Sequence, residues 1–273
     1  MTLFEALTAA RQKIDRLDAR LLLQYATGCS HTDLLARPET PVIAPAYAQF
    51  AEWVERRAAG EPLAYLVGEA EFRGRVFQVS PAVLIPRPET EVLIDLALEK
   101  LRGLTVPKVL DLGTGSGVVA ISLALECPAA EVLAVDLSKE AISVARNNAG
   151  RLGAKLAFCA SDWFAELAGQ RFDLIVSNPP YVAEGDPHLS RDGLPFEPQM
   201  ALSDGEAGGN GLACIRRIVA AAPAHLTAGG WLLFEHGYDQ GAASRNLLHD
   251  AGFKAASTFP DLAEIDRVSG GHL

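Results

Sequence analysis

From Val106 onward, β-prone segments alternate with helical segments, and this alternation constrains the fold of the chain more than any other feature. The β-prone segments are rich in aliphatic residues and cover residues 109–113, 131–136, 156–162, 172–177 and 231–235. Helical segments lie between most of them, notably at 118–127, 139–152 and 212–226. Nearly continuous apolar strands joined by helices are typical of a parallel sheet that helices cover on both faces. We therefore expect an α/β fold.

The residues before this alternation have the pattern of a small helical module. Thr2 and Glu5 match a capping box, and Gly28 is suited to end the helix that follows. Three- and four-residue intervals between apolar residues predict that this first helix is continuous, and the residues are Leu7, Ala10, Ile14, Leu17 and Leu21. A second, short helix should begin at Ser30, and a third is expected over 46–59.

Between the two patterns, the sequence predicts a hairpin and a connector. Gly74 separates two short β-prone runs within residues 71–79, which favours a hairpin. The proline-rich run VLIPRPETE, at residues 83–91, is expected to be an ordered connector.

These patterns divide the chain into three predicted domains. They are a helical domain at 1–70, the hairpin and connector at 71–86, and the sheet domain at 87–273. Within the sheet domain, the segment 182–210 is rich in Gly, Pro and Asp and matches no element. Loops of that length inside a domain are usually functional or mobile.

The charge of the chain limits the partners that it can bind stably. It carries 24 Lys and Arg against 34 Asp and Glu, a formal net charge of −10. Residues 1–86 hold 9 basic and 10 acidic side chains, whereas residues 87–273 hold 15 and 24. Phosphate backbones and anionic membrane surfaces attract basic proteins, so we expect neither stable nucleic-acid binding nor membrane binding.

The spacing of cysteines and histidines gives no sign of a metal or of disulfides. The four cysteines lie far apart without a Cys-x-x-Cys pair, and the six histidines show no ligand spacing. The first residues mix acids with bases and lack the apolar run of a signal peptide. The longest uncharged apolar stretch, 218–234, is interrupted by Pro223 and two glycines, which makes it a poor membrane span. We therefore expect a cytoplasmic protein with no bound metal.

The strongest local motif is DLGTGSG, at residues 111–117, where the first predicted strand turns into a helix. Glycines there let a ligand approach the backbone, and the helix N-terminus offers N–H groups to an anion. A dinucleotide fingerprint would need glycine at Val118, so the spacing favours a nucleoside with a carboxylate, and S-adenosyl-L-methionine fits. An ordinary glycine-rich turn is the alternative. The candidate cofactor-binding residues of this loop are Gly113, Thr114, Gly115, Ser116 and Gly117.

Acidic residues end the next two predicted strands. Asp136 can accept hydrogen bonds from both ribose hydroxyls, although a solvated aspartate at a strand end is about as frequent. Asp162 and Trp163 pair an acceptor for an exocyclic amine with an aromatic surface for adenine, although Trp163 alone would more often be core. Because the carboxyl ends of parallel strands meet at one crevice, the three residues together strengthen the prediction of a cofactor site.

The fourth predicted strand ends in SNPPY, at residues 177–181. Two consecutive prolines supply no backbone N–H, so the turn is stiff and presents carbonyl acceptors. With the Asn178 side-chain oxygen and the Pro179 carbonyl both accepting, the turn matches a planar NH2 group, and Tyr181 could stack on the substrate. A proline turn that merely ends a strand is the alternative. The candidate catalytic residues are Asn178, Pro179, Pro180 and Tyr181, with Asn178 also beside the cofactor.

Together, these segments resemble the HemK/PrmC family. Its members are bacterial protein-(glutamine-N5) methyltransferases that modify the glutamine of the Gly-Gly-Gln loop in class-1 peptide chain release factors. NPPY is shared with other amino-group methyltransferases, whereas LIPRPETE is far more specific. In family order, the segments are GEPLAYLVGEAEFRG (60–74), VLIPRPETEVL (83–93), DLGTGSG, SDWF (161–164), SNPPY, FEPQMAL (196–202) and FEHGYDQG (234–241).

The resemblance implies a Rossmann-like, S-adenosylmethionine-dependent methyltransferase sheet with a small N-terminal helical domain and a connecting β-hairpin. It places the cofactor at 113–117, Asp136 and Trp163, with Asp162 as a weaker candidate. Residues 178–181 would hold the glutamine amide, and the helical domain would dock the release factor.

Two residues of the family's connector motif have no firm role, and one residue departs from the family pattern. Leu84 and Arg87 lie in the connector motif and could line the pocket, but Arg87 could equally form a structural ion pair with a nearby acid. Glu264 stands where the family commonly has glycine, which concerns only a C-terminal turn.

Two other functions stay open at this point. An adenine-N6 nucleic-acid methyltransferase would present the same NH2 group from a flipped base. However, the domain with the motifs carries nearly all of the excess negative charge, opposite to the basic surface expected around a duplex. The other is a non-catalytic regulator that binds S-adenosyl-L-methionine. The intact NPPY disfavours it, because a protein that only binds the cofactor has no use for an amine-binding turn.

Overall fold

The structure is a computed structural model that describes residues 1–191 and 193–273, and it divides into two units. The first unit is Met1–Glu69 together with a short segment that ends at Phe196. The second unit is Ala70–Arg191 and Glu197–Leu273. The predicted end of the helical domain, at residue 70, lies next to this division, and the predicted hairpin at 71–79 falls in the second unit.

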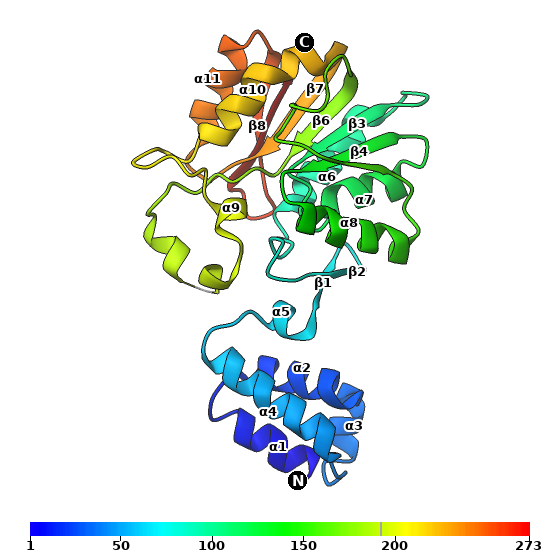
Figure 1. The fold of residues 1–273 in the computed structure, drawn as a ribbon, viewed down its shortest axis with the longest axis vertical. Helices are drawn as coiled ribbons and strands as arrows, with labels where there is room; N and C mark the ends of the chain where they lie inside the picture. The colour runs from blue at the N-terminus through cyan, green and yellow to red at the C-terminus, as the bar shows by residue number, and fades with distance from the viewer. Residues whose placement is uncertain (192) are drawn as a thin grey trace. The chain divides into compact units, whose positions relative to one another are not determined.

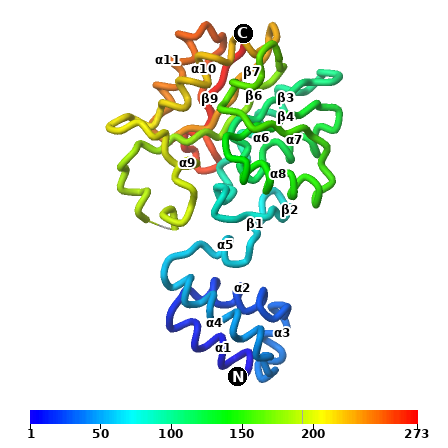
Figure 2. Tube along the Cα trace, viewed as in Figure 1, coloured from blue at the N-terminus to red at the C-terminus, as the bar shows by residue number. Residues whose placement is uncertain are grey.

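The first unit consists of short helices around an apolar core. Leu22, Leu23 and Phe50 lie in this core and are at most 2% exposed. The helices are α1 (Leu3–Ala10), α2 (Arg16–Thr27), α3 (His31–Ala36), α4 (Ala44–Ala58) and α5 (Leu63–Val67), and Figures 1 and 2 show their course.

The ends of these helices follow local capping more closely than apolar periodicity. The capping box of Thr2 and Glu5 is present, and Gly28 ends α2 with a φ of 72°. The prediction of one continuous first helix is wrong, because Asp15 caps a new helix by accepting a hydrogen bond from the Leu17 N–H at 2.7 Å. Both helices pack on the same core, so the apolar spacing continues across the break.

The second unit contains a seven-stranded sheet with the strand order β5-β4-β3-β6-β7-β9-β8. The five strands from β5 to β7 run parallel, as the strand–helix alternation predicts. The strands are β3 (Lys108–Leu112), β4 (Glu131–Asp136), β5 (Ala157–Ala160), β6 (Phe172–Ser177), β7 (Leu226–Glu235), β8 (Lys254–Pro260) and β9 (Asp266–His272).

Strand β9 corrects the expectation of a wholly parallel sheet. β9 pairs antiparallel with both β7 and β8. The sequence did not predict β9 because it contains Gly270 and Gly271, and glycine has low β propensity. Gly270 is needed there because a Cβ atom would stand 2.6 Å from the carbonyl oxygen of Leu232 in the neighbouring strand.

Helices cover both faces of the sheet (Figure 1). Alternate strand residues face opposite cores: Val109 packs with α6 and α7, and Leu110 packs with α10. The helices α6 (Thr90–Leu101), α7 (Val118–Glu126) and α8 (Lys139–Leu152) cover one face, and α10 (Ala213–His225) and α11 (Gly241–Asp250) cover the other. The three predicted helices of this region are present, whereas α6 and α11 were not predicted.

Two connecting regions complete the fold. The predicted hairpin is formed by β1 (Glu69–Phe72) and β2 (Arg75–Gln78). The segment 182–210, which matched no element in the sequence, contains the 3₁₀ turns η1 (Pro187–Ser190) and η2 (Leu194–Phe196) and the short helix α9 (Gln199–Leu202). Its residue 192 lies outside the described residues. Within the described part of the chain, none of the helices combines the length and apolarity needed to cross a membrane.

Candidate active site

The glycine-rich loop joins the end of β3 to the start of α7. Gly113, Gly115 and Gly117 have φ angles of 72°, 55° and 88°, a conformation that residues with side chains rarely adopt. The N–H groups of Gly113 and Thr114 both donate to the Val135 carbonyl at 2.9 Å, which ties the loop to β4. Gly117 is the N-cap of α7 and provides no side-chain cap, so the start of this helix can bind an anion.

A buried carboxyl group, Asp111, supports this loop. Its Oδ2 accepts hydrogen bonds from the Thr114 hydroxyl at 2.7 Å and from the Ala120 N–H at 3.2 Å. Burial raises the pKa of Asp111 to about 7. Asp111 therefore fixes the loop against the first turn of α7.

The acids at the ends of β4 and β5 have different environments. Oδ2 of Asp136 accepts from the Gly115 N–H and Oδ1 from the Ser138 N–H, both at 2.9 Å, and burial raises the pKa of this carboxyl. A carboxylate oxygen has more than one lone pair, so Asp136 can still accept from a ligand hydroxyl. Asp162, in contrast, forms an exposed ion pair with Arg217 at 2.9 Å. The structure therefore leaves Asp162 the weaker candidate of the two.

Trp163 has an unusual backbone conformation, with a φ of 49°. Ser161 holds this turn: its hydroxyl donates to the Trp163 carbonyl at 2.9 Å and accepts from the Glu166 N–H at 3.2 Å. The indole ring lies beside Gly113, where a Cβ atom would stand 3.7 Å from it. Strained residues that their surroundings hold in place cluster at functional sites.

Asn178 follows β6 and lines the same pocket as the glycine-rich loop. Its Nδ2 donates to the Thr90 hydroxyl at 3.1 Å. Among the described residues, its Oδ1 accepts no hydrogen bond. The side-chain oxygen of Asn178 is therefore available to a ligand.

The Tyr181 side chain and backbone are hydrogen-bonded within the protein. Its hydroxyl donates to the buried Glu235 carboxylate at 3.0 Å, and its carbonyl accepts from Gln240 Nε2 at 2.9 Å. The pKa of Tyr181 is raised, chiefly by burial. The structure thus gives the Tyr181 hydroxyl an anchoring contact with Glu235.

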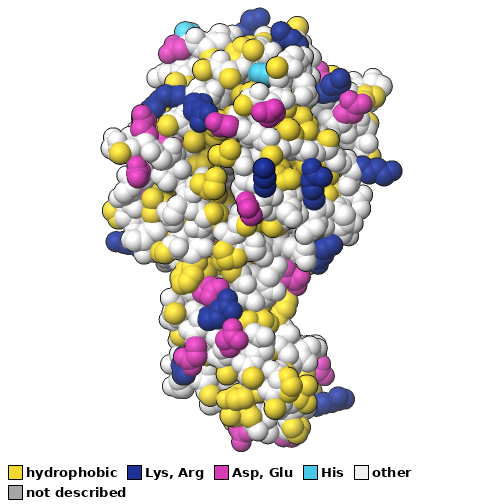
Figure 3. All heavy atoms as spheres, viewed as in Figure 1, with side chains coloured by type: hydrophobic (Ala, Val, Ile, Leu, Met, Phe, Trp, Pro, Cys, Tyr) yellow, Lys and Arg dark blue, Asp and Glu magenta, His cyan; other side chains and the backbone are white. Residues whose placement is uncertain are grey.

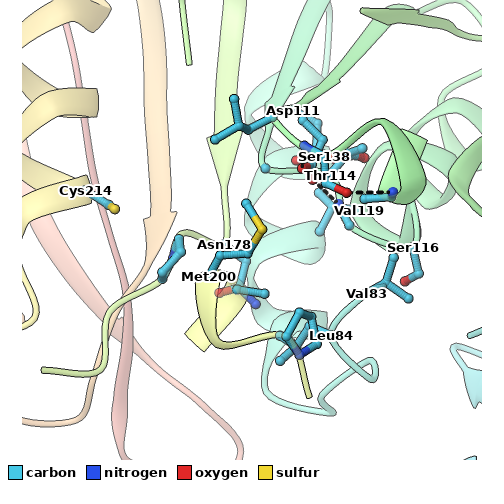
Figure 4. A pocket seen from close by; sticks show the side chains of 18 of the residues that line it. Val83, Leu84, Asp111, Thr114, Ser116, Val119, Ser138, Asn178, Met200 and Cys214 are labelled. Carbon is cyan, nitrogen blue, oxygen red and sulfur yellow. Dashed lines mark hydrogen bonds between the residues drawn. The ribbon is translucent and has the colours of Figure 1, made fainter. Parts of the chain in front are cut away.

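Most of the predicted site residues line one cavity of about 350 Å³ within the second unit. The connector contributes Leu84 and Arg87, and the region of α9 contributes Met200; Figure 4 shows Leu84, Asn178 and Met200 around this cavity. The lining includes the predicted residues Gly113, Thr114, Gly115, Ser116, Asp136, Asp162, Trp163, Asn178 and Pro180, whereas Gly117, Pro179 and Tyr181 lie outside it.

Comparison with known proteins decides the family. The model of the PrmC N-terminal domain matches residues 3–68, and that of the Methyltransferase small domain matches residues 90–190. The release factor glutamine methyltransferase of Burkholderia pseudomallei is 51% identical over 267 residues, covering 95% of this chain and 93% of the relative. That of Bordetella pertussis is 48% identical over 274 residues and both chains are covered completely, at 100%. The chain belongs to the release factor glutamine methyltransferase family.

Solved structures agree with the fold of this release factor glutamine methyltransferase family member. The catalytic domain of hMettl16 in complex with MAT2A 3′UTR hairpin 1 has a TM-score of 0.57 at 13% identity, covering 97% of this chain and 90% of that chain. The T. thermophilus 16S rRNA N2 G1207 methyltransferase in complex with AdoMet and guanosine has a TM-score of 0.54 at 24% identity, covering 75% and 49%. At such identities the likeness concerns the Rossmann-like methyltransferase fold alone.

The pocket of this family member fits an adenosyl cofactor with a carboxylate. Ser116 lines the pocket, and its buried hydroxyl has no hydrogen-bond partner among the described residues. A buried polar group without a partner is costly, so a polar ligand group there would satisfy it. The uncapped start of α7 can bind an anion, and Asp136 and Trp163 also lie in the pocket lining.

Several supporting residues were missed in the sequence. Ser161, Thr90 and Glu235 were not singled out, although Glu235 ends a predicted strand as Asp136 does. Asn148 could have been recognised in the sequence as a supporting residue, because it is a polar residue on the buried side of its helix. Its Nδ2 donates to the Ser116 carbonyl at 2.9 Å, which braces the glycine-rich loop from α8.

Proposed function

We propose that this protein binds S-adenosyl-L-methionine and transfers its methyl group to the side-chain amide nitrogen of the glutamine in the Gly-Gly-Gln loop of class-1 release factors. The observation that carries the proposal is the Asn178 side-chain oxygen, which accepts no hydrogen bond among the described residues and belongs to the same pocket as the glycine-rich loop. This arrangement places an acceptor for an NH2 group beside a fitting cofactor site.

The glycine-rich loop, Asp136 and Trp163 would hold the cofactor. When bound, the cofactor would supply an electrophilic methyl group to the amide nitrogen, which would give up one N–H proton. In this assignment, the start of α7 binds the carboxylate, Asp136 accepts from the ribose hydroxyls and Trp163 contacts the adenine.

The turn at Asn178 would hold the glutamine amide. An amide nitrogen is a poor nucleophile because its lone pair is delocalised, as the rotation barrier of roughly 18–20 kcal/mol shows. Asn178 Oδ1 would accept from one N–H group and orient the nitrogen toward the methyl group. The Pro179 carbonyl stays the predicted acceptor for the second N–H group, although Pro179 lies outside the pocket lining. The chain's contribution is therefore positioning and electrostatic stabilisation.

The helical unit would dock the release factor. It exposes large apolar side chains, and Figure 3 shows apolar side chains gathered over part of its surface. Phe4, Leu35 and Ile43 of this unit are 61%, 71% and 70% exposed. Such exposed apolar residues suit a protein partner better than a phosphate backbone. A substrate of the translation apparatus also supports a cytoplasmic location.

A methyl-transfer assay tests the proposal. Purified protein with labelled S-adenosyl-L-methionine should label a class-1 release factor, and should not label the same factor after a Gln→Ala change in its Gly-Gly-Gln loop. Equal labelling of both factors, or preferential labelling of DNA adenine, would overturn the assignment.

The turn is tested separately by Asn178→Ala. This change should reduce turnover far more than cofactor affinity, because Asn178 would orient the substrate during transfer. Unchanged turnover would show that Asn178 does not orient the amide.

A further inference from the structure

We infer that Glu235, acting through Thr90, is a positioning residue that fixes the Asn178 side-chain amide with its oxygen toward the pocket. The inference rests on the proposed function, in which that oxygen accepts a hydrogen bond from the glutamine amide. In the parallel pairing of β6 with β7, Ser177 lies opposite Phe234, so the residues that follow them, Asn178 and Glu235, come to the same edge of the sheet.

A short chain of hydrogen bonds joins these residues. Asn178 Nδ2 donates to the Thr90 hydroxyl at 3.1 Å, and that hydroxyl donates to Glu235 Oε2 at 2.7 Å. Thr90 and Glu235 are only 2% and 1% exposed. Water therefore has little access to replace either partner.

The chemistry of the three groups determines which way the Asn178 amide faces. Burial raises the pKa of Glu235, whereas the hydrogen bonds from Thr90 and Tyr181 lower it. In its ionised form this carboxylate can only accept, so the single hydrogen of the Thr90 hydroxyl is committed to Glu235. The Thr90 oxygen can then only accept, and Asn178 must present its NH2 group to it. The opposite orientation would place two acceptors against each other in a buried site.

Glu235 also holds the other end of the same turn. Its second oxygen, Oε1, accepts from the Tyr181 hydroxyl at 3.0 Å. One buried carboxylate therefore anchors both the first and the last residue of the sequence NPPY. It makes the pocket face of Asn178 an acceptor, which favours a substrate with an NH2 group over one with a carboxylate oxygen.

Two variants of Thr90 test this chain. Thr90→Val keeps the shape but removes the hydroxyl, and should lower kcat by at least about tenfold while the Kd for S-adenosyl-L-methionine stays within about twofold. Thr90→Ser restores the hydroxyl and should recover most of the lost turnover. Equal kcat in Thr90→Val and wild type, or equally slow Val and Ser variants with wild-type melting temperatures, would overturn the inference.

Asn178→Asp gives an independent test. If any oxygen at this position could hold the substrate amide, the aspartate would accept its hydrogen bond and the variant would keep its turnover. In the inferred arrangement, the new carboxylate and Glu235 compete for one Thr90 hydrogen, so turnover should fall as far as in Asn178→Ala. Retained turnover would overturn the inference.

A spectroscopic measurement needs no substrate and separates this inference from the proposed function. The ¹H–¹⁵N signals of the Asn178 side-chain NH2, assigned by their loss in Asn178→Ala, should shift in Thr90→Val and stay near the wild-type position in Thr90→Ser. Unshifted signals in Thr90→Val would contradict the chain even if the release factor is methylated. Shifted signals without methylation of the release factor would support the chain of hydrogen bonds and would contradict only the proposed substrate.

Discussion

Glu197 forms an ion pair with Arg87, and the second oxygen of Glu197 accepts a hydrogen bond from the Ile85 N–H at 3.0 Å. The Glu197 side chain is 2% exposed, whereas that of Arg87 is 32% exposed. The contact joins the connector to the segment that leads into α9, and both flank the pocket through Leu84 and Met200. The sequence left open whether Arg87 lines the pocket or forms an ion pair, and it does both.

We predict that Glu197→Ala destabilises the protein by about 1–3 kcal/mol, because it leaves the Ile85 N–H and the Arg87 guanidinium without their partner. It should also weaken binding of S-adenosyl-L-methionine, because the connector and the α9 region would separate more easily. Urea unfolding and titration calorimetry measure the two effects.

A matched control for Glu197→Ala is Glu206→Ala. Glu206 pairs with Arg216 at 3.0 Å, but the two side chains are 48% and 41% exposed. Exposed ion pairs contribute at most about 1 kcal/mol, so this change should alter neither measurement appreciably. Equal effects of the two variants would mean that the buried contact has no special role.

Two glycines of the same loop should respond differently to alanine. At Gly117, a Cβ atom would stand 2.7 Å from Ile121 Cδ1 and 3.1 Å from the Ala145 Cβ, in addition to the strain of a φ of 88°. At Gly115, no atom of the described residues would lie within 4 Å of a Cβ atom, so only the φ of 55° opposes a side chain. We predict that Gly115→Ala costs about 1 kcal/mol of unfolding free energy and that Gly117→Ala costs about 2–4 kcal/mol. Urea unfolding checks the order, and similar losses would contradict it.

The parts of the site that the sequence predicted are those whose chemistry is local. A run of glycines at a strand–helix turn determines positive φ angles, and two consecutive prolines determine a stiff turn, whatever the rest of the chain does. Because the strands run parallel, residues at their carboxyl ends reach one edge without further information. For this reason Gly113, Asp136 and Asn178 could be assigned to one pocket before the fold was known.

The parts that the sequence missed depend on partners far along the chain. Thr90 lies 88 residues from Asn178 and 145 residues from Glu235, and neither contact has a local signal. The antiparallel edge was missed because it contains Gly270, and glycine has low β propensity. Glycine is required there by the close approach of the neighbouring strand. The apolar spacing continues across the end of α1 and so gave no sign that a new helix begins there. The start of α2 is set by its capping residue, Asp15.

The buried carboxyl of Asp111 should make the stability of the protein depend on pH. Its pKa rises from 3.8 to about 7 on folding, so the folded state binds the proton more tightly. Because proton binding is linked to folding, Asp111 favours the folded state below its unfolded pKa. That contribution to stability is lost as the pH rises through its folded pKa. The full effect is on the order of a few kcal/mol.

Asp111→Asn should remove this dependence. An amide oxygen can still accept from Thr114 and Ala120, so the loop should keep its conformation. The stability of the variant relative to wild type should therefore increase between about pH 4 and pH 7. Urea unfolding at several pH values measures it, and a constant difference across this range would show that Asp111 does not titrate as expected.

Glu264 occupies a position that suits glycine. Its φ is 61°, within a turn in which the Asp261 N–H donates to the Ile265 carbonyl at 2.8 Å. Residues with side chains lose roughly 1–2 kcal/mol in this conformation, whereas glycine loses roughly 0.5–1 kcal/mol through the extra freedom of the unfolded chain. Glu264→Gly should therefore stabilise the protein by up to about 1 kcal/mol, which thermal and urea unfolding can detect. Glu264→Ala keeps the unfavourable φ and should give no gain, so equal gains from both changes would trace the effect to the lost charge instead.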